Sequence, residues 1–132
     1  MASEWEKRIP QITDESFEPV LRESIKAVQD KKLEGRKDDK GKLRYDLEAQ
    51  DARRGLVTIL TFGANKYEDR NWEKGMLWGR VYAAAQRHLS AWWSGEELDA
   101  ESGLPHLDHA ACCIHFLQAY SKRGVGKDDR PK

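Results

Sequence analysis

Apolar side chains recur at helical spacing along most of this 132-residue chain, and no segment shows the sustained alternation typical of a half-buried strand. The clearest stripe lies in residues 80–94, where Val81, Ala85, Leu89 and Trp92 share one face. Further helices are expected over residues 14–33, 46–69 and 105–124. The pattern predicts an all-α fold of four helices, most simply a four-helix bundle.

The length fits one main domain. We expect an N-terminal helix and basic loop (1–40), a helical domain (41–122) and a disordered tail (123–132). Residues 35–44 are polar and basic and include Lys42 and Arg44. Two interpretations stay open for this segment, a solvated loop or a mobile arm that meets phosphates.

Bulk properties exclude several classes of protein. The formal net charge is zero, which argues against a nucleic-acid-binding helical protein. No run of about 18 apolar residues predicts a membrane span, and the N-terminus lacks the apolar stretch of a signal peptide. Adjacent Cys112 and Cys113 are poorly placed to bond to each other, which fits a reducing cytoplasm and predicts a cytoplasmic location.

Charge is divided unevenly along the chain. Residues 88–121 contain none of the 23 lysines and arginines, yet they hold all four histidines and five of the 23 acids. The remainder therefore carries 23 bases against 18 acids. Carboxylates and imidazoles gathered without basic partners suit a divalent cation, and the excess of positive charge elsewhere suits a phosphate-bearing ligand.

Helical geometry predicts which of these groups point inward. His88 falls within the apolar arc of residues 80–94, and Glu96 joins it if the helix continues by one turn. In residues 105–124 the expected arc contains Leu107, Ala110, Ile114 and Leu117. His106 lies inside that arc and His109 at its margin. Asp108, Cys112 and His115 are expected on the opposite, wetter face.

A single inward histidine is usually a core residue with a satisfied hydrogen bond. Several inward histidines and a glutamate on consecutive helices instead indicate a metal or acid–base site, because burying them unpaired costs several kcal/mol. Asp99 and Glu101 in the connection can complete an oxygen-rich site. Carboxylates favour Mg²⁺ or Mn²⁺, whereas histidines favour Mn²⁺, Zn²⁺ or Fe²⁺.

Basic residues of the second and third helices are candidates for phosphate binding. Lys66 and Arg70 lie at i and i+4 beside an apolar stripe, and Asn71 and Trp72 follow them. Arg87 is rotated toward the flank of its helix. Lysine and arginine in these positions can reach phosphate oxygens, although an ordinary solvated helix edge has the same pattern.

Three strings resemble a known family: GKLRYDL (41–47), LTFGANKYEDRNW (60–72) and RHLSAWWSGEELDAESGLPHLDHAACC (87–113). They are similar to the phage dATP/dGTP diphosphohydrolases, the MazZ-type branch of the MazG-like all-α nucleotide pyrophosphohydrolases. The resemblance spans about residues 41–120. It implies hydrolysis of dGTP or dATP to the monophosphate and pyrophosphate, and in phages with 2-aminoadenine DNA a supply of dGMP for that pathway.

The resemblance also implies Mg²⁺ or Mn²⁺ and a homodimer or homotetramer of helical bundles. MazG-type enzymes usually hold metal with ExxE on one helix and ExxD on the next. This chain has Glu96-x-x-Asp99, but His106-x-x-His109 where acids are expected. The expected metal ligands are therefore Glu96, Asp99 and Glu101, followed by His106 and His109.

The expected mechanism is an in-line attack of water at the α-phosphorus. Glu97 or His88 would accept the proton of the water. The residues expected to bind substrate are Lys66, Arg70, Asn71, Trp72, Arg87, Lys42 and Arg44. Two alternatives stay open, a house-cleaning hydrolase of other triphosphates and a non-enzymatic module that binds metal, nucleotide or a protein partner.

Overall fold

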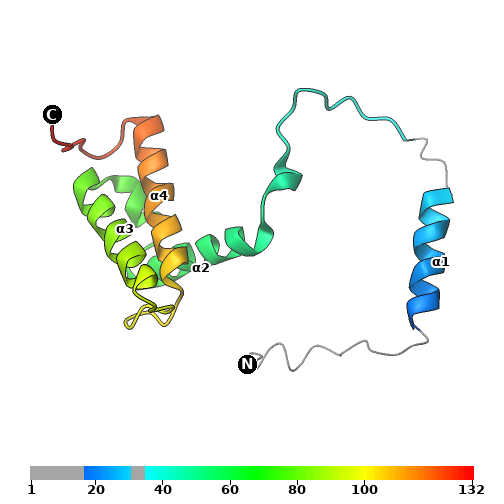
Figure 1. Cartoon of the computed structure of the whole chain (residues 1–132). Coiled ribbons are helices and arrows are strands. Elements are labelled where there is room, and N and C mark those ends of the chain that lie inside the picture. The colour runs from blue at the N-terminus through cyan, green and yellow to red at the C-terminus, as the bar shows by residue number, and fades with distance from the viewer. Residues whose placement is uncertain (1–16, 31–34) are drawn as a thin grey trace. The chain divides into compact units, whose positions relative to one another are not determined.

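The computed structural model describes residues 17–30 and 35–132, and the chain divides into two compact units, residues 1–42 and 43–132. In the first unit, α1 (Phe17–Asp30) confirms that a helix forms within residues 14–33 (Figure 1). The expected ends of that helix lie outside the described residues. A hydrogen bond from the Lys42 N–H to the Asp39 carbonyl (3.0 Å) closes a turn at the end of this unit.

The second unit is built from three α-helices and two short 3-10 helices. They follow in the order η2 (Tyr45–Leu47), α2 (Gln50–Lys66), η3 (Asn71–Lys74), α3 (Trp78–Trp93) and α4 (His106–Arg123). No strand occurs in the described parts of the chain, where the only β-type pairings are two isolated bridges. The all-α prediction is confirmed, while a four-helix bundle stays a prediction because α1 belongs to the first unit.

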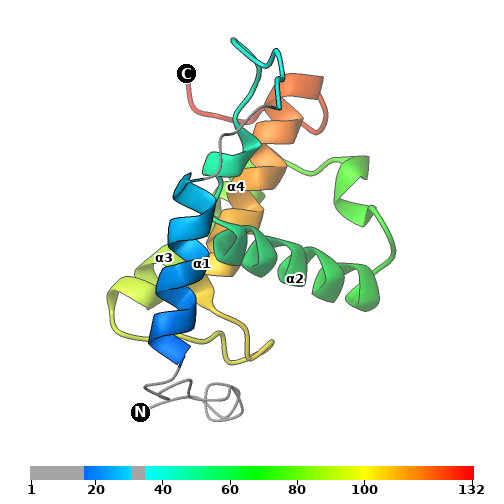
Figure 2. The same ribbon diagram turned by 90° about the vertical axis from the view of Figure 1, so that its right-hand side faces the viewer.

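Helices α3 and α4 are antiparallel neighbours, and α2 runs across α4 (Figures 1 and 2). The buried apolar side chains come from all three helices. They are Ile59 from α2, Val81 and Ala85 from α3, and Ala110, Cys112 and Tyr120 from α4. Because α4 contributes half of this small core and contacts both other helices, it is the central element of the unit.

The expected orientation of α4 was partly wrong. Cys112, placed on the wet face by periodicity, is only 3% exposed, whereas Leu107 and Ile114, placed inward, are 42% and 46% exposed. The reason is that α2 covers the face that carries Asp108 and Cys112. A Cβ added to Gly55 of α2 would lie 2.3 Å from an Asp108 oxygen, so the two helices approach closely there.

The segment after Gly124, which composition indicated to be a tail, contacts the start of α3. The Trp78 indole N–H donates to the Val125 carbonyl (2.9 Å), and the Trp78 backbone N–H donates to the Lys127 carbonyl (3.0 Å). An Asp129 carboxylate oxygen accepts from the Gly79 N–H at 2.7 Å. This carboxylate serves as an N-terminal cap supplied from a distant part of the sequence.

None of the helices within the described residues is long and apolar enough to cross a membrane.

Gly126 is expected to be indispensable to this C-terminal contact. It has a φ of +77°, and an added Cβ would lie 2.4 Å from the Met76 carbonyl oxygen. Gly124 has a φ of +67° but open space around it. Both alanine variants should lose about 1–2 kcal/mol through the left-handed backbone, and Gly126→Ala should lose at least about 1 kcal/mol more through the clash. Urea denaturation measures the difference, and equal losses would contradict the close approach.

Candidate functional site

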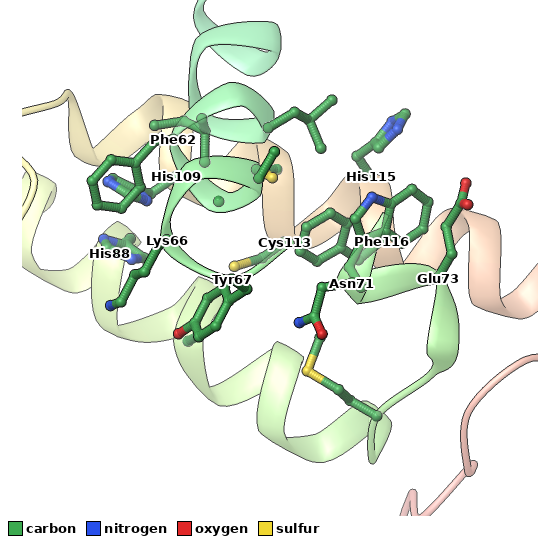
Figure 3. A pocket seen from close by; sticks show the side chains of 18 of the residues that line it. Phe62, Lys66, Tyr67, Asn71, Glu73, His88, His109, Cys113, His115 and Phe116 are labelled. Atoms are coloured by element: carbon green, nitrogen blue, oxygen red, sulfur yellow. The ribbon is translucent and has the colours of Figure 1, made fainter. Parts of the chain in front are cut away.

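A cleft opens between α2, η3, α3, α4 and the connection between α3 and α4. It encloses about 1270 Å³, enough for a nucleotide, since ligand pockets usually measure about 300–1,000 Å³. Figure 3 shows His88, His109 and Lys66 toward one end and His115, Phe116 and Glu73 toward the other. The polar lining includes Lys66, Arg70, Asn71, Arg87, His88, Asp99, Glu101, His106 and His109.

The three inward histidines form one cluster. His88 comes from α3, and His106 and His109 come from the first turn of α4. The Nδ1 atoms of His88 and His106 are 2.9 Å apart, and the rings of His88 and His109 stack at 4.5 Å with an interplanar angle of 6°. Two imidazole nitrogens at such a distance either share one proton or both offer lone pairs to a common cation.

The connection between α3 and α4 brings Asp99 to these rings. Leu98 and Pro105 form an antiparallel bridge, and the His106 N–H donates to the Glu97 carbonyl at 2.9 Å. The Asp99 carboxylate accepts from the backbone N–H (2.9 Å) and the hydroxyl (3.0 Å) of Ser102. The backbone hydrogen bond is the main cause that lowers the pKa of Asp99, so this group is ionised at neutral pH.

Burial keeps two of the histidines neutral. Desolvation is the main cause that lowers the pKa of both His88 and His109, and their mutual repulsion adds to the shift at His88. The nearby Asp99 acts in the opposite direction on both rings. Near neutral pH each ring therefore presents an unprotonated nitrogen, the form in which histidine binds metal or accepts a proton.

One donor atom from each of His88, Asp99 and His106 lies within 4.8 Å of the others. His106 is 5% exposed, and its Nε2 has no hydrogen-bond partner among the described residues. Glu96 Oε2 is 3.4 Å from that nitrogen, without the geometry of a hydrogen bond. Two imidazoles and a carboxylate fit a divalent ion such as Mn²⁺, and a buried nitrogen without a partner is what a ligand position requires.

Other expected metal ligands have different partners. Glu96 lies beside His106 as described, and Glu101 forms an exposed ion pair with Lys66 across the cleft. His109 Nε2 lies 2.7 Å from the Ser102 hydroxyl and 3.9 Å from the Asp99 carboxylate. Four of the five expected ligands, Asp99, Glu101, His106 and His109, thus line the cleft together with His88. Glu96 does not line it, although its carboxylate lies beside His106.

The expected substrate-binding residues divide into two groups. Lys66, Arg70, Asn71, Trp72 and Arg87 line the cleft, whereas Arg44 pairs with Asp46 at 2.7 Å outside it and Lys42 lies in the first unit. The side chain of Glu97, the expected catalytic carboxylate, is exposed and does not line the cleft.

Trp72 is engaged in packing. Its ring stacks on Phe116 at 4.6 Å, its carbonyl accepts from the Tyr120 hydroxyl at 2.5 Å, and the Arg123 guanidinium lies 5.8 Å from its centroid. Arg123 and Arg70 also share Glu73, at 3.3 and 3.0 Å. The indole therefore already has an aromatic and a cationic neighbour.

Sequence reasoning did not single out Ser102. Its position three residues after Asp99 is the signal that could have revealed it, because a serine there can donate hydrogen bonds to the aspartate carboxylate within one turn.

The helical second unit has a histidine–aspartate cluster at one end of a cleft that basic residues also line. This combination suits a protein that acts on phosphate-bearing ligands. Residues 32–130 match the family described as dATP/dGTP diphosphohydrolase, N-terminal, and the chain belongs to this family. The resemblance found in the sequence is thereby confirmed.

A relative from Salmonella phage PMBT28, named dATP/dGTP diphosphohydrolase, is 30% identical over 98 residues. The match covers 74% of this chain and 33% of the phage protein, so the chain spans about a third of that curated relative. No solved structure matches the chain significantly.

The lowered pKa values of His88 and His109 predict how stability depends on pH. Each folded-state pKa is below the ordinary value of 6.5, so the unfolded chain binds more protons as the pH falls through that value. With chelator present, the free energy of unfolding should decline from about pH 7 downward. His88→Gln should flatten the decline, whereas His115→Gln, outside the stack, should keep it. Urea denaturation as a function of pH measures both, and an unchanged slope in His88→Gln would refute the prediction.

Proposed function

We propose that this chain hydrolyses dGTP or dATP to the deoxynucleoside monophosphate and pyrophosphate. Membership of the diphosphohydrolase family supports the proposal. The observation that carries it is a single cleft that contains both the histidine–aspartate cluster and several basic side chains, among them Lys66, Arg70 and Arg87. A triphosphate needs both parts, because charge must be neutralised at the reacting phosphorus and along the leaving group.

His88, Asp99 and His106 would hold a divalent ion, Mg²⁺ or Mn²⁺, with Glu96 adjacent to extend the donor set. When bound, such an ion neutralises phosphate charge and lowers the pKa of a coordinated water. The two nitrogen donors suit Mn²⁺ better than Mg²⁺, which prefers oxygen.

The basic side chains would bind the phosphate oxygens. Lys66 would exchange Glu101 for the substrate, and Arg70 would exchange Glu73. Both pairs involve exposed cations, and pairs of this kind contribute about 0–1 kcal/mol, so the exchange requires little free energy. Arg87 lies on the same wall of the cleft as His88 and would contact the phosphate nearest the cluster.

The reaction requires a proton acceptor. Water attacks the α-phosphorus, the bond from that phosphorus to the bridging oxygen breaks, and pyrophosphate leaves. A neutral imidazole of His109 would accept the proton of the water, since burial lowers its pKa. We prefer this ring to Glu97, whose side chain lies outside the cleft, and to His88, whose single lone pair the ion would occupy.

The cellular role and assembly follow as further parts of the proposal. In a phage with 2-aminoadenine DNA, the enzyme would supply dGMP and deplete competing nucleotides. A homodimer or homotetramer would cover apolar side chains that the second unit leaves exposed, among them Leu107, Ile114 and Trp93, the last 83% exposed.

Product analysis tests the reaction. The full chain, incubated with each of the eight common nucleotides and Mg²⁺ or Mn²⁺, should convert dGTP or dATP to monophosphate and pyrophosphate. Asp99→Asn should reduce kcat by about 100-fold or more, because a ligand worth several kcal/mol is weakened. Asp128→Asn, an exposed carboxylate outside the cleft, is the matched control and should retain activity. Release of nucleoside and triphosphate would point to a different phosphohydrolase chemistry.

Removal of the Lys66 ammonium should weaken productive binding of the triphosphate. Loss of one hydrogen bond to a charged group corresponds to about 1.5–3 kcal/mol, so Lys66→Met should lower kcat/KM by about 10–100-fold. Lys122→Met removes an exposed lysine of α4 that does not line the cleft. Steady-state kinetics compares the two variants, and equal effects would remove Lys66 from the phosphate site.

A further inference from the structure

Ser102 connects two groups of the histidine–aspartate cluster. It is half-buried in the turn that follows Asp99. Its hydroxyl oxygen lies 3.0 Å from Asp99 Oδ2, 2.7 Å from His109 Nε2 and 3.2 Å from the Leu104 nitrogen. Its backbone N–H donates to the same Asp99 oxygen at 2.9 Å. One small side chain thus contacts both an acid of the loop and a histidine of α4.

Hydrogen-bond accounting fixes the direction of each contact. A serine hydroxyl has one proton to donate and two lone pairs to accept. The Leu104 N–H can only donate, and the Asp99 carboxylate oxygen accepts from both the backbone N–H and the hydroxyl of Ser102. The hydroxyl proton therefore goes to Asp99, and His109 Nε2 must carry a hydrogen that it donates to the hydroxyl oxygen.

We propose that Ser102 is a positioning residue that orients the Asp99 carboxylate and fixes His109 as its Nε2–H tautomer. The Nδ1 atom of His109 is then the one nitrogen of the neutral ring with a free lone pair. The consequence for catalysis rests on the proposed function, in which Asp99 helps to hold the ion and His109 can accept a proton. The assignment of the tautomer is independent of it.

The structure offers no equivalent replacement for this hydroxyl. The His109 side chain is only 13% exposed, and the Asp99 carboxylate lies 3.9 Å from Nε2, beyond hydrogen-bond distance. Without the hydroxyl, Asp99 keeps only its backbone donor, and the Nε2–H of His109 loses its acceptor. Removal of such an outer partner of a metal ligand typically weakens metal binding or activity by about 10–100-fold.

Nitrogen NMR of the imidazoles tests the assignment directly. In the full chain, free of metal and at a pH where the ring is neutral, His109 should show a protonated Nε2 and an unprotonated Nδ1. Ser102→Ala should shift the ring toward the other tautomer or a mixture, and Ser102→Thr, which keeps the hydroxyl, should restore the wild-type pattern. A wild-type ring protonated at Nδ1, or an unchanged ring in Ser102→Ala, would overturn the proposal.

Calorimetric titration with Mn²⁺ alone measures the consequence for the cluster. Ser102→Ala should bind Mn²⁺ about tenfold or more weakly than wild type, and Ser102→Thr should recover most of the loss. Ser94→Ala removes the hydroxyl of the residue that caps the end of α3, which donates to the Ser90 carbonyl, and should not change the affinity. Equal affinities in Ser102→Ala and Ser94→Ala would refute the orientation of Asp99 by Ser102. If dNTP hydrolysis is absent while the tautomer is as assigned, the proposed function fails and the inference stands.

Discussion

The close return of the chain between α3 and α4 is the constraint on which the cluster depends. The backbone bonds of Glu97 with His106 and of Asp99 with Leu104, 2.9 and 2.8 Å, set the spacing between the end of one helix and the start of the other. That spacing places His88 against His106 and His109. Because Asp99 belongs to the connection between α3 and α4, the same backbone bonds place its carboxylate beside the rings. A longer connection would leave these four groups on separate, independently moving segments.

The cluster is polar, and the burial of polar groups costs free energy unless they find partners. Desolvation lowers the pKa of His88 and His109, and donors from Ser102 lower the pKa of the Asp99 carboxylate. Among the described residues, the one buried side-chain nitrogen without a hydrogen-bond partner is His106 Nε2. An unsatisfied buried polar atom costs about 1–3 kcal/mol, which a metal ligand bond at that nitrogen would offset. The unpaired nitrogen is thus a local cost in stability, of the kind that a bound ligand would remove.

Periodicity predicted the helices well because one strong apolar stripe is enough to define each of them. The expected helix of residues 80–94 corresponds to α3 at Trp78–Trp93, and the inward position of His88 followed from its stripe, as that of His106 followed from the stripe of residues 105–124. The buried residues of α4 were harder to predict, because the sequence of one helix does not show which neighbouring helix covers the face opposite its apolar stripe. Cys112 is buried by that second contact. Ser102 was missed for a related reason: its role arises from a turn, which has no periodicity.

Acidic and basic side chains meet inside the cleft and are already partly paired there. Lys66 forms an ion pair with Glu101, and Glu73 forms ion pairs with both Arg70 and Arg123. The positive charge available to a ligand is therefore smaller than the sequence count suggests. These pairs are largely exposed on the basic side, however, so water already screens them and each contributes about 0–1 kcal/mol. A triphosphate offers several charged oxygens at once, and it can replace weak single pairs with multiple charge-assisted bonds. In the proposed function, the glutamates would act as temporary partners of the cations, which a triphosphate would replace.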